Sequence, residues 1–152
     1  MTTTVRSLGP VRVPSQLMPS ALGLLHQARR GLQEATTLKL PAERYATAHL
    51  AALRGAAAVL AAKTRPTDGR LRRRRPTSAW VLLTEVSPEL SEWAAFFAAG
   101  AAKRAAAEAG VLRAVTAREA DDLIRDAGTF LALVETTLGL VPTLPVGIPR
   151  AG

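Results

Sequence analysis

Apolar residues recur along this chain at steps of three and four positions, which is the spacing of one face of an α-helix. One such segment begins at Ser20, a candidate N-cap, and ends near residue 35. Another begins with a capping box formed by Thr116 and Glu119 and ends at Gly139. Their apolar stripes are Ala21, Leu25, Ala28, Leu32 and Ala35, and Ala120, Ile124, Ala127, Leu131, Val134 and Leu138. We therefore predict a long amphipathic helix over each segment.

A third helix is predicted to begin at Pro41, where the missing N–H of proline costs nothing. This helix is apolar on more than one side, which is typical of a helix at the centre of a bundle. We assign its stripe to Ala46, Leu50, Leu53, Ala57 and Leu60, flanked by Tyr45, Ala52, Ala56 and Val59.

The middle of the chain is divided by turn residues. Pro66, Asp68 and Gly69 break the helical pattern, and a short helix is predicted within TSAWVLLTEV. Ser87 is then a candidate N-cap for a helix over PELSEWAAFFAAGAAKRAAAEAG, which Gly110 ends. Its apolar stripe includes Leu90, Trp93, Phe97 and Ala101. A glycine inside a helix is unfavourable, so we expect the one within this helix, at position 100, to mark a close contact or a bend.

These elements predict an all-α protein, an up-and-down four-helix bundle with an extra short helix. Hydrophobic residues make up 48% of the chain but aromatic residues only 4%, so alanine and leucine must build the core. We divide the chain into a disordered N-terminal arm (1–18), a helical bundle (19–140) with a basic loop at 64–76, and an extended C-terminal tail (141–152).

The amino-acid composition excludes several kinds of functional site. The chain contains no cysteine, which rules out disulfides, thiolate metal sites and a cysteine nucleophile. The N-terminal sequence lacks the apolar segment of a signal peptide, and no uninterrupted apolar run reaches the ~18 residues of a membrane helix. We therefore expect a cytoplasmic protein that does not contact a membrane.

The formal charge of +8 is concentrated in one segment. Seven basic residues and a single acid lie between Lys63 and Arg75, whereas the helical body is close to neutral. The candidate nucleic-acid-binding residues are Arg70, Arg72, Arg73, Arg74 and Arg75. They could neutralise phosphates in a salt-sensitive and sequence-independent manner. No aromatic residue is interleaved with them to stack on bases, so a merely solvated loop is the competing interpretation.

Three blocks of the sequence resemble a known family. They are AERYATAHLAALRGAAAVLAA, SAWVLLTEVSPELSEWAAFFAAGAAKRAAAEAG and TAREADDLIRDAGTFLALVETTLGL, and the likeness extends from Leu22 to Leu140. The chain resembles the actinobacterial HEPN-like family, the SAV-type branch of the HEPN superfamily. This resemblance implies a bundle of four or five helices. Many HEPN domains are metal-independent ribonucleases of toxin–antitoxin or defence systems, and they are usually homodimers.

The catalytic signature implied by the resemblance is an arginine followed four to six residues later by a histidine, near the end of the third long helix. Histidine would transfer protons at the ribose or the leaving oxygen, and arginine would stabilise the charge that develops on phosphorus. Arg104 occupies the corresponding region here, but no histidine follows it anywhere in the chain. The usual motif is therefore absent at that position.

Two residues of the second predicted helix do satisfy the spacing of the motif. Arg44 and His49 are separated by five positions, which places their side chains about 140° apart around a helix. They could meet only across a dimer interface, and the competing interpretation is a structural histidine hydrogen-bonded inside the bundle. The only other histidine, His26, is expected at the surface.

A group of acidic residues on the last predicted helix is a candidate metal site. Asp121, Asp122 and Asp126 could hold Mg²⁺, but no further carboxylate motif accompanies them, and acids near a helix N-terminus are favoured by the helix dipole. We predict no metal and no cofactor. The aromatic residues Trp80, Trp93, Phe96 and Phe97 are assigned to the core.

The sequence therefore favours a HEPN-like binding or regulatory module without the usual ribonuclease activity. Its expected partners are RNA or another polyanion, a protein partner, and a second copy of the chain. The alternative is a metal-independent ribonuclease that uses Arg44 and His49 across a dimer.

Overall fold

The computed structural model describes residues 18–64 and 78–143, and these residues form helices and no strand. The helices are α2 (Met18–Thr37), α3 (Pro41–Lys63), α5 (Ala79–Val86), α6 (Ser91–Ala99), α7 (Ala101–Glu108) and α8 (Ala117–Thr137), with 3₁₀ turns η1 (Pro88–Leu90) and η2 (Leu112–Ala114). The predicted all-α fold class is confirmed. The five candidate arginines of the basic loop, and most of both predicted tails, lie outside the described residues.

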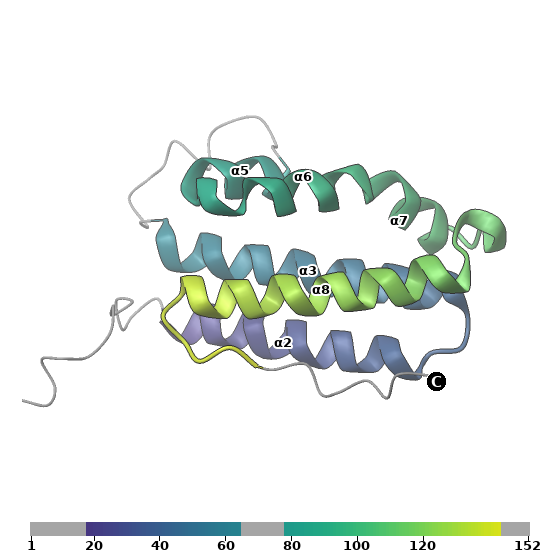
Figure 1. The fold of residues 1–152 in the computed structure, drawn as a ribbon, viewed down its shortest axis with the longest axis horizontal. Coiled ribbons are helices and arrows are strands. Elements are labelled where there is room, and N and C mark those ends of the chain that lie inside the picture. Colours follow the sequence, from purple (N-terminus) through teal and green to yellow (C-terminus); the bar gives the residue numbers. More distant parts are fainter. Residues whose placement is uncertain (1–17, 65–77, 144–152) are drawn as a thin grey trace, which may run out of the picture.

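Helix α3 lies at the centre of the bundle. It packs against α2 and α8 on one side and against α5 and α7 on the other (Figure 1). It approaches α8 closely at Gly55, where a Cβ atom would overlap the side chain of Leu131. Small residues on α3 therefore let the neighbouring helices come close to its axis, as expected for a core built largely of alanine.

The buried face of α3 differs from the predicted stripe. The predicted residues Ala46, Leu50, Leu53, Ala57 and Leu60 are only partly buried, whereas the buried residues are Ala42, Tyr45, Ala48, His49, Ala51, Ala52, Gly55, Ala56, Ala58, Val59 and Ala62. The physical reason is size, because alanine and glycine permit close helix contacts that leucine would prevent. Among the described helices, α3 alone has the length and hydropathy of a membrane span, and 56% of that window is buried inside the bundle.

The helix ends follow the predicted local chemistry. Ser78 caps α5 by accepting a hydrogen bond from the N–H of Val81, and Thr116 and Glu119 form the full capping box of α8. Gly110 and Gly139 adopt left-handed conformations with φ of 86° and 78° after α7 and α8. In both cases the next residue donates to a carbonyl in the last turn of the helix, which is the Schellman arrangement. The predicted ends at these two glycines are confirmed.

The predicted third long helix is interrupted. Its first turn is the 3₁₀ turn η1, and the hydroxyl of Ser87 makes no capping bond there. The helix is broken again at Gly100, which separates α6 from α7. The expectation of a close contact or bend at Gly100 is confirmed on both counts, because a Cβ atom at this position would lie 2.7 Å from the hydroxyl oxygen of Tyr45.

Candidate functional site around His49

The centre of the site is His49, whose side chain α3 directs beneath the junction of α6 and α7. The residue is 1% exposed, and its Nε2 atom lies 2.8 Å from the carbonyl oxygen of Phe97. A carbonyl can only accept, so Nε2 carries the proton and donates. The imidazole also makes edge contacts with Trp80 and Phe97 and stacks on Tyr45, with ring centroids 5.8–6.3 Å apart. His49 is therefore held on all sides by core residues.

This hydrogen bond provides a cause for the break between α6 and α7. The Phe97 carbonyl accepts from His49 and also from the N–H of Gly100, at 3.1 Å, in a tighter turn. Regular hydrogen bonding resumes when Arg104 donates to the Gly100 carbonyl at 3.0 Å. A side chain that inserts into the hydrogen-bond ladder is a recognised cause of a helix kink. The hydrogen bond from His49 therefore helps to set the conformation of the α6–α7 junction, which faces His49 across the site.

The second ring nitrogen of His49 has no hydrogen-bond partner. Both His49 Nδ1 and Arg104 Nε are buried without a partner among the described residues. Burial lowers the pKa of His49, the bond to Phe97 opposes this shift, and the positive charge of Arg104 lowers the pKa further. His49 is therefore neutral near pH 7, with a lone pair on Nδ1 and a guanidinium close enough to influence its charge.

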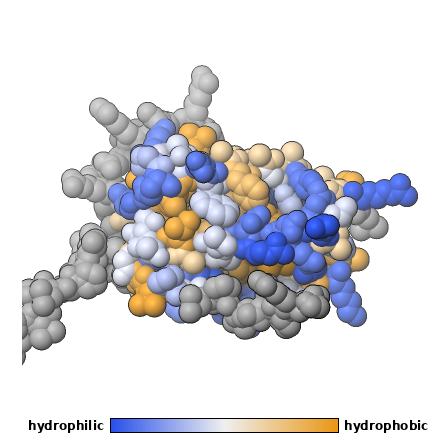
Figure 2. Space-filling model, viewed as in Figure 1, coloured by the Kyte–Doolittle hydropathy of each residue, from blue (hydrophilic) through white to orange (hydrophobic). Residues whose placement is uncertain are grey.

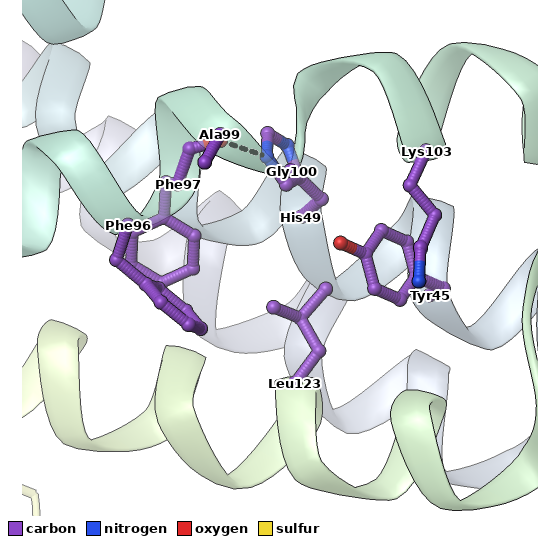
Figure 3. A pocket seen from close by; sticks show the side chains of 8 residues that line it. All are labelled: Tyr45, His49, Phe96, Phe97, Ala99, Gly100, Lys103 and Leu123. Carbon is purple, nitrogen blue, oxygen red and sulfur yellow. Dashed lines mark hydrogen bonds between the residues drawn. The ribbon is translucent and has the colours of Figure 1, made fainter.

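A pocket of about 250 Å³ opens beside this histidine (Figure 3). It lies between the α6–α7 junction and α8, with α3 as its floor, and the side chain of Leu123 enters from α8. The pocket is lined by Tyr45, His49, Phe96, Phe97, Ala99, Gly100, Lys103 and Leu123. On the same side of the molecule, Figure 2 shows apolar surface along α6 and hydrophilic surface along α8.

Lys103 and Tyr45 supply the hydrogen-bond donors of the pocket. Lys103 forms an ion pair with Glu119 of α8, which joins α7 to α8 and raises the pKa of the lysine. Burial raises the pKa of Tyr45, so its hydroxyl stays protonated at neutral pH. That hydroxyl points into the pocket (Figure 3) and makes no hydrogen bond to another described residue.

The structure does not bring together the two residues of the predicted catalytic pair. Arg44 forms a 2.6 Å salt bridge with Asp121 and a weak bond to the Ala35 carbonyl, and it has no contact with His49. The arginine that lies near His49 is Arg104, from the region where the resemblance places the catalytic arginine. Sequence reasoning noted both residues but could not pair them, because they lie on different helices.

The acidic residues of α8 are used in ion pairs and do not converge. Asp121 binds Arg44, and Asp122 lies 3.1 Å from Arg125. Burial and the neighbouring Asp122 raise the pKa of Asp126. Within residues 18–64 and 78–143, no group of three histidine or acidic side chains is arranged to hold a metal ion.

A second buried polar cluster was missed from the sequence. Glu135 of α8 is only 7% exposed and accepts two hydrogen bonds from Arg29 of α2, at 2.6 and 3.2 Å. It also accepts from the N–H and hydroxyl of Thr143, at 2.8 and 3.1 Å. The start of the predicted C-terminal tail is therefore bound back onto the bundle. Burial alone would raise the pKa of Glu135, but these four bonds outweigh it and the pKa is lowered.

The fold and site together define a small all-α bundle whose third long helix is broken above a buried histidine. A family model described as SAV_6107-like HEPN matches residues 35–135, which is more than half of the chain. The chain therefore belongs to this HEPN-like family. No curated protein and no solved structure matches it.

Proposed function

We propose that this HEPN-like protein is a binding or regulatory module that lacks the ribonuclease activity of many HEPN domains. The burial of His49 carries the proposal. A general acid or base must come within hydrogen-bond reach of the substrate proton. His49 is 1% exposed, one ring nitrogen is bonded to Phe97, and its pKa is lowered. The exposed histidine, His26, stands on α2 at the opposite side of α3 from Arg104.

An RNA cleavage assay tests the absence of activity. We expect the wild-type protein, His49→Ala and the control His26→Ala to leave a structured and a single-stranded RNA equally intact, with and without a chelator. Cleavage by the wild type that disappears in His49→Ala and persists in His26→Ala would overturn the proposal. In that case Arg104→Ala and Arg44→Ala would identify the arginine that acts with His49.

For the binding partner we propose RNA or another polyanion, held by Arg70 and Arg72–Arg75. The charge distribution supports this, since the helical body is nearly neutral and the basic residues are concentrated between the end of α3 and the start of α5. Each phosphate contact releases counterions, so the affinity should fall steeply with salt. Changing Arg72, Arg73, Arg74 and Arg75 to serine should weaken binding and flatten the plot of log affinity against log salt.

Fluorescence anisotropy at several salt concentrations, beside thermal melts, measures both effects. The melting temperature should hardly change if these arginines contact the polyanion and not the helical bundle. Unchanged affinity and an unchanged salt slope would reduce the segment to a solvated connection. Lost binding together with a collapsed melting temperature would mean that the arginines are structural.

The proposal includes a homodimer. Its support is the partly buried apolar face of α3, which consists of Ala46, Leu50, Leu53, Ala57 and Leu60. Apolar faces of this kind favour association with a second copy. Light scattering that gives a monomer at high micromolar concentration would contradict it.

A ribonuclease that pairs Arg44 and His49 across such a dimer is the runner-up function. Two observations count against it. The Arg44 guanidinium is already bonded to Asp121 within its own chain, and a second chain has no access to the buried imidazole of His49.

A further inference from the structure

We propose that the pocket beside Gly100 binds a small molecule with one aromatic ring and an acceptor oxygen, to which the Tyr45 hydroxyl donates. Three features of the pocket carry this inference, namely a hydroxyl that is not bonded to another described residue, a volume that suits a single ring, and a rim that offers further donors. It is independent of the proposed polyanion binding, which involves a different part of the chain.

The first feature is the Tyr45 hydroxyl. Tyr45 is 7% exposed, and its hydroxyl points into the pocket without a hydrogen bond to another described residue (Figure 3). The hydroxyl is accessible to solvent from the pocket, so a bound acceptor oxygen would exchange a hydrogen bond to water for one to the ligand. The hydroxyl can take this position because Gly100 has no side chain, since a Cβ atom there would lie 2.7 Å from the hydroxyl oxygen.

The second feature is the size and lining of the pocket. A cavity of about 150 Å³ holds benzene, so the 250 Å³ here has room for one ring and a small substituent. Phe96, Phe97 and Leu123 provide apolar walls. Aromatic rings favour edge-to-face and offset contacts with a bound ring, which makes a planar ligand a better fit than a flexible chain.

The third feature is the rim formed by Lys103. Its ammonium group has three N–H donors, and Glu119 takes one of them. Because Glu119 offsets the charge of Lys103, the rim offers N–H donors to an acceptor oxygen and does not by itself distinguish a neutral oxygen from an anionic one. A carboxylate and a carboxamide share this chemistry, and benzoate and benzamide are the probes that separate them.

Two-dimensional NMR titration of the full-length protein tests the site, with toluene as the ring that lacks an acceptor. We expect saturable shifts at Tyr45, Gly100 and Lys103 with benzoate or benzamide at concentrations up to about 10 mM, and much weaker ones with toluene. A stronger response to benzoate would assign the ligand as an anion, and a stronger response to benzamide as a neutral carbonyl compound.

Two variants locate the binding. Tyr45→Phe removes only the hydroxyl and should weaken binding at least about fivefold, the value of one hydrogen bond. Ala99→Phe places a bulky side chain at the exposed mouth and should abolish binding, while the melting temperature shows that the variant folds. No saturable shifts with either probe, equal binding of toluene, or affinity that both variants leave unchanged would overturn the proposal.

Discussion

Two buried polar clusters in this molecule differ in how fully their hydrogen bonds are made. In the Glu135 cluster, formed by Arg29, Glu135 and Thr143, the carboxylate accepts four hydrogen bonds. In the His49 cluster, formed by Tyr45, His49 and Arg104, His49 donates to the Phe97 carbonyl and Arg104 Nη1 binds Glu108, while His49 Nδ1 and Arg104 Nε have no partner among the described residues. Native proteins rarely leave buried polar atoms unpaired, so each exception needs a reason.

We interpret this difference as one between a structural cluster and a cluster that is available for binding. The Glu135 cluster joins α2, α8 and the segment after α8, and both oxygens of its carboxylate accept hydrogen bonds from within the chain. The His49 cluster lies beside a pocket and keeps donors and an acceptor uncommitted. A bundle that only needed stability would gain by replacing those groups with apolar ones of similar shape. We therefore expect substitutions in the Glu135 cluster to affect mainly stability, and substitutions in the His49 cluster to affect mainly binding.

The largest effect is expected from Glu135→Ala. This change leaves the Arg29 guanidinium without its partner and removes the acceptor for Thr143. Breaking one side of a buried ion pair costs about 3–5 kcal/mol, and the 25% exposure of the Arg29 side chain places this case near the lower value. Chemical denaturation followed by circular dichroism measures the free energy of unfolding.

Glu135→Gln is the matched control, because it keeps an acceptor oxygen and loses only the charge. It should cost clearly less than Glu135→Ala. Equal and small costs for the two variants, below about 0.5 kcal/mol, would show that the cluster is not a structural link. Amide exchange at Thr143 should accelerate in both variants, since its N–H donates to this carboxylate.

A smaller effect is expected on the pH dependence of stability, and the two clusters should act in different ranges. The folded-state pKa of His49 lies below its ordinary value of 6.5, so the unfolded chain takes up a proton first. Stability is therefore fully retained above about pH 6.5 and falls as the pH drops below it. The pKa of Glu135 is lowered from 4.5, so its contribution is present above pH 4.5 and is lost at more acidic pH.

Denaturation series between pH 7.5 and pH 3 (roughly the range of both groups) distinguish these two phases. His49→Gln retains a donor for the Phe97 carbonyl but cannot titrate, so it should remove the upper phase and leave the lower one. Glu135→Gln should reduce the lower phase, to which Glu89 and Glu119 also contribute because their pKa values are lowered, and should leave the upper phase unchanged. An upper phase that persists in His49→Gln would assign it to another group.

Most of the fold could be predicted from local sequence signals. The capping box at Thr116, the glycines at 110 and 139 and the apolar stripes of α2 and α8 each depend on residues close together in the chain. The buried face of α3 could not be predicted in this way. Alanine and leucine both count as apolar, and which of them faces the core depends on how closely the neighbouring helices approach.

The candidate site could be predicted only in its components. His49 and Arg104 were both recognised, but spacing along one helix suggested Arg44 as the partner, whereas the structure pairs Arg44 with Asp121. The Arg29–Glu135 pair spans 106 positions and has no local signature. Gly100 offered the best signal, since a glycine within a helix indicates that something must approach closely, and here that group is the Tyr45 hydroxyl.

The smallest effect is expected when a single hydroxyl group is removed from each cluster. This pair of changes compares the two clusters directly, because one hydroxyl is hydrogen-bonded to a described residue and the other is not. The Thr143 hydroxyl donates to Glu135 at 3.1 Å, so Thr143→Val should cost about 1 kcal/mol. The Tyr45 hydroxyl makes no hydrogen bond to another described residue, so Tyr45→Phe should change the free energy of unfolding by less than about 0.5 kcal/mol. Paired denaturation curves of the two variants measure the contrast. A cost for Tyr45→Phe as large as that for Thr143→Val would mean that the tyrosine hydroxyl is bonded within the folded chain and is not free for a ligand.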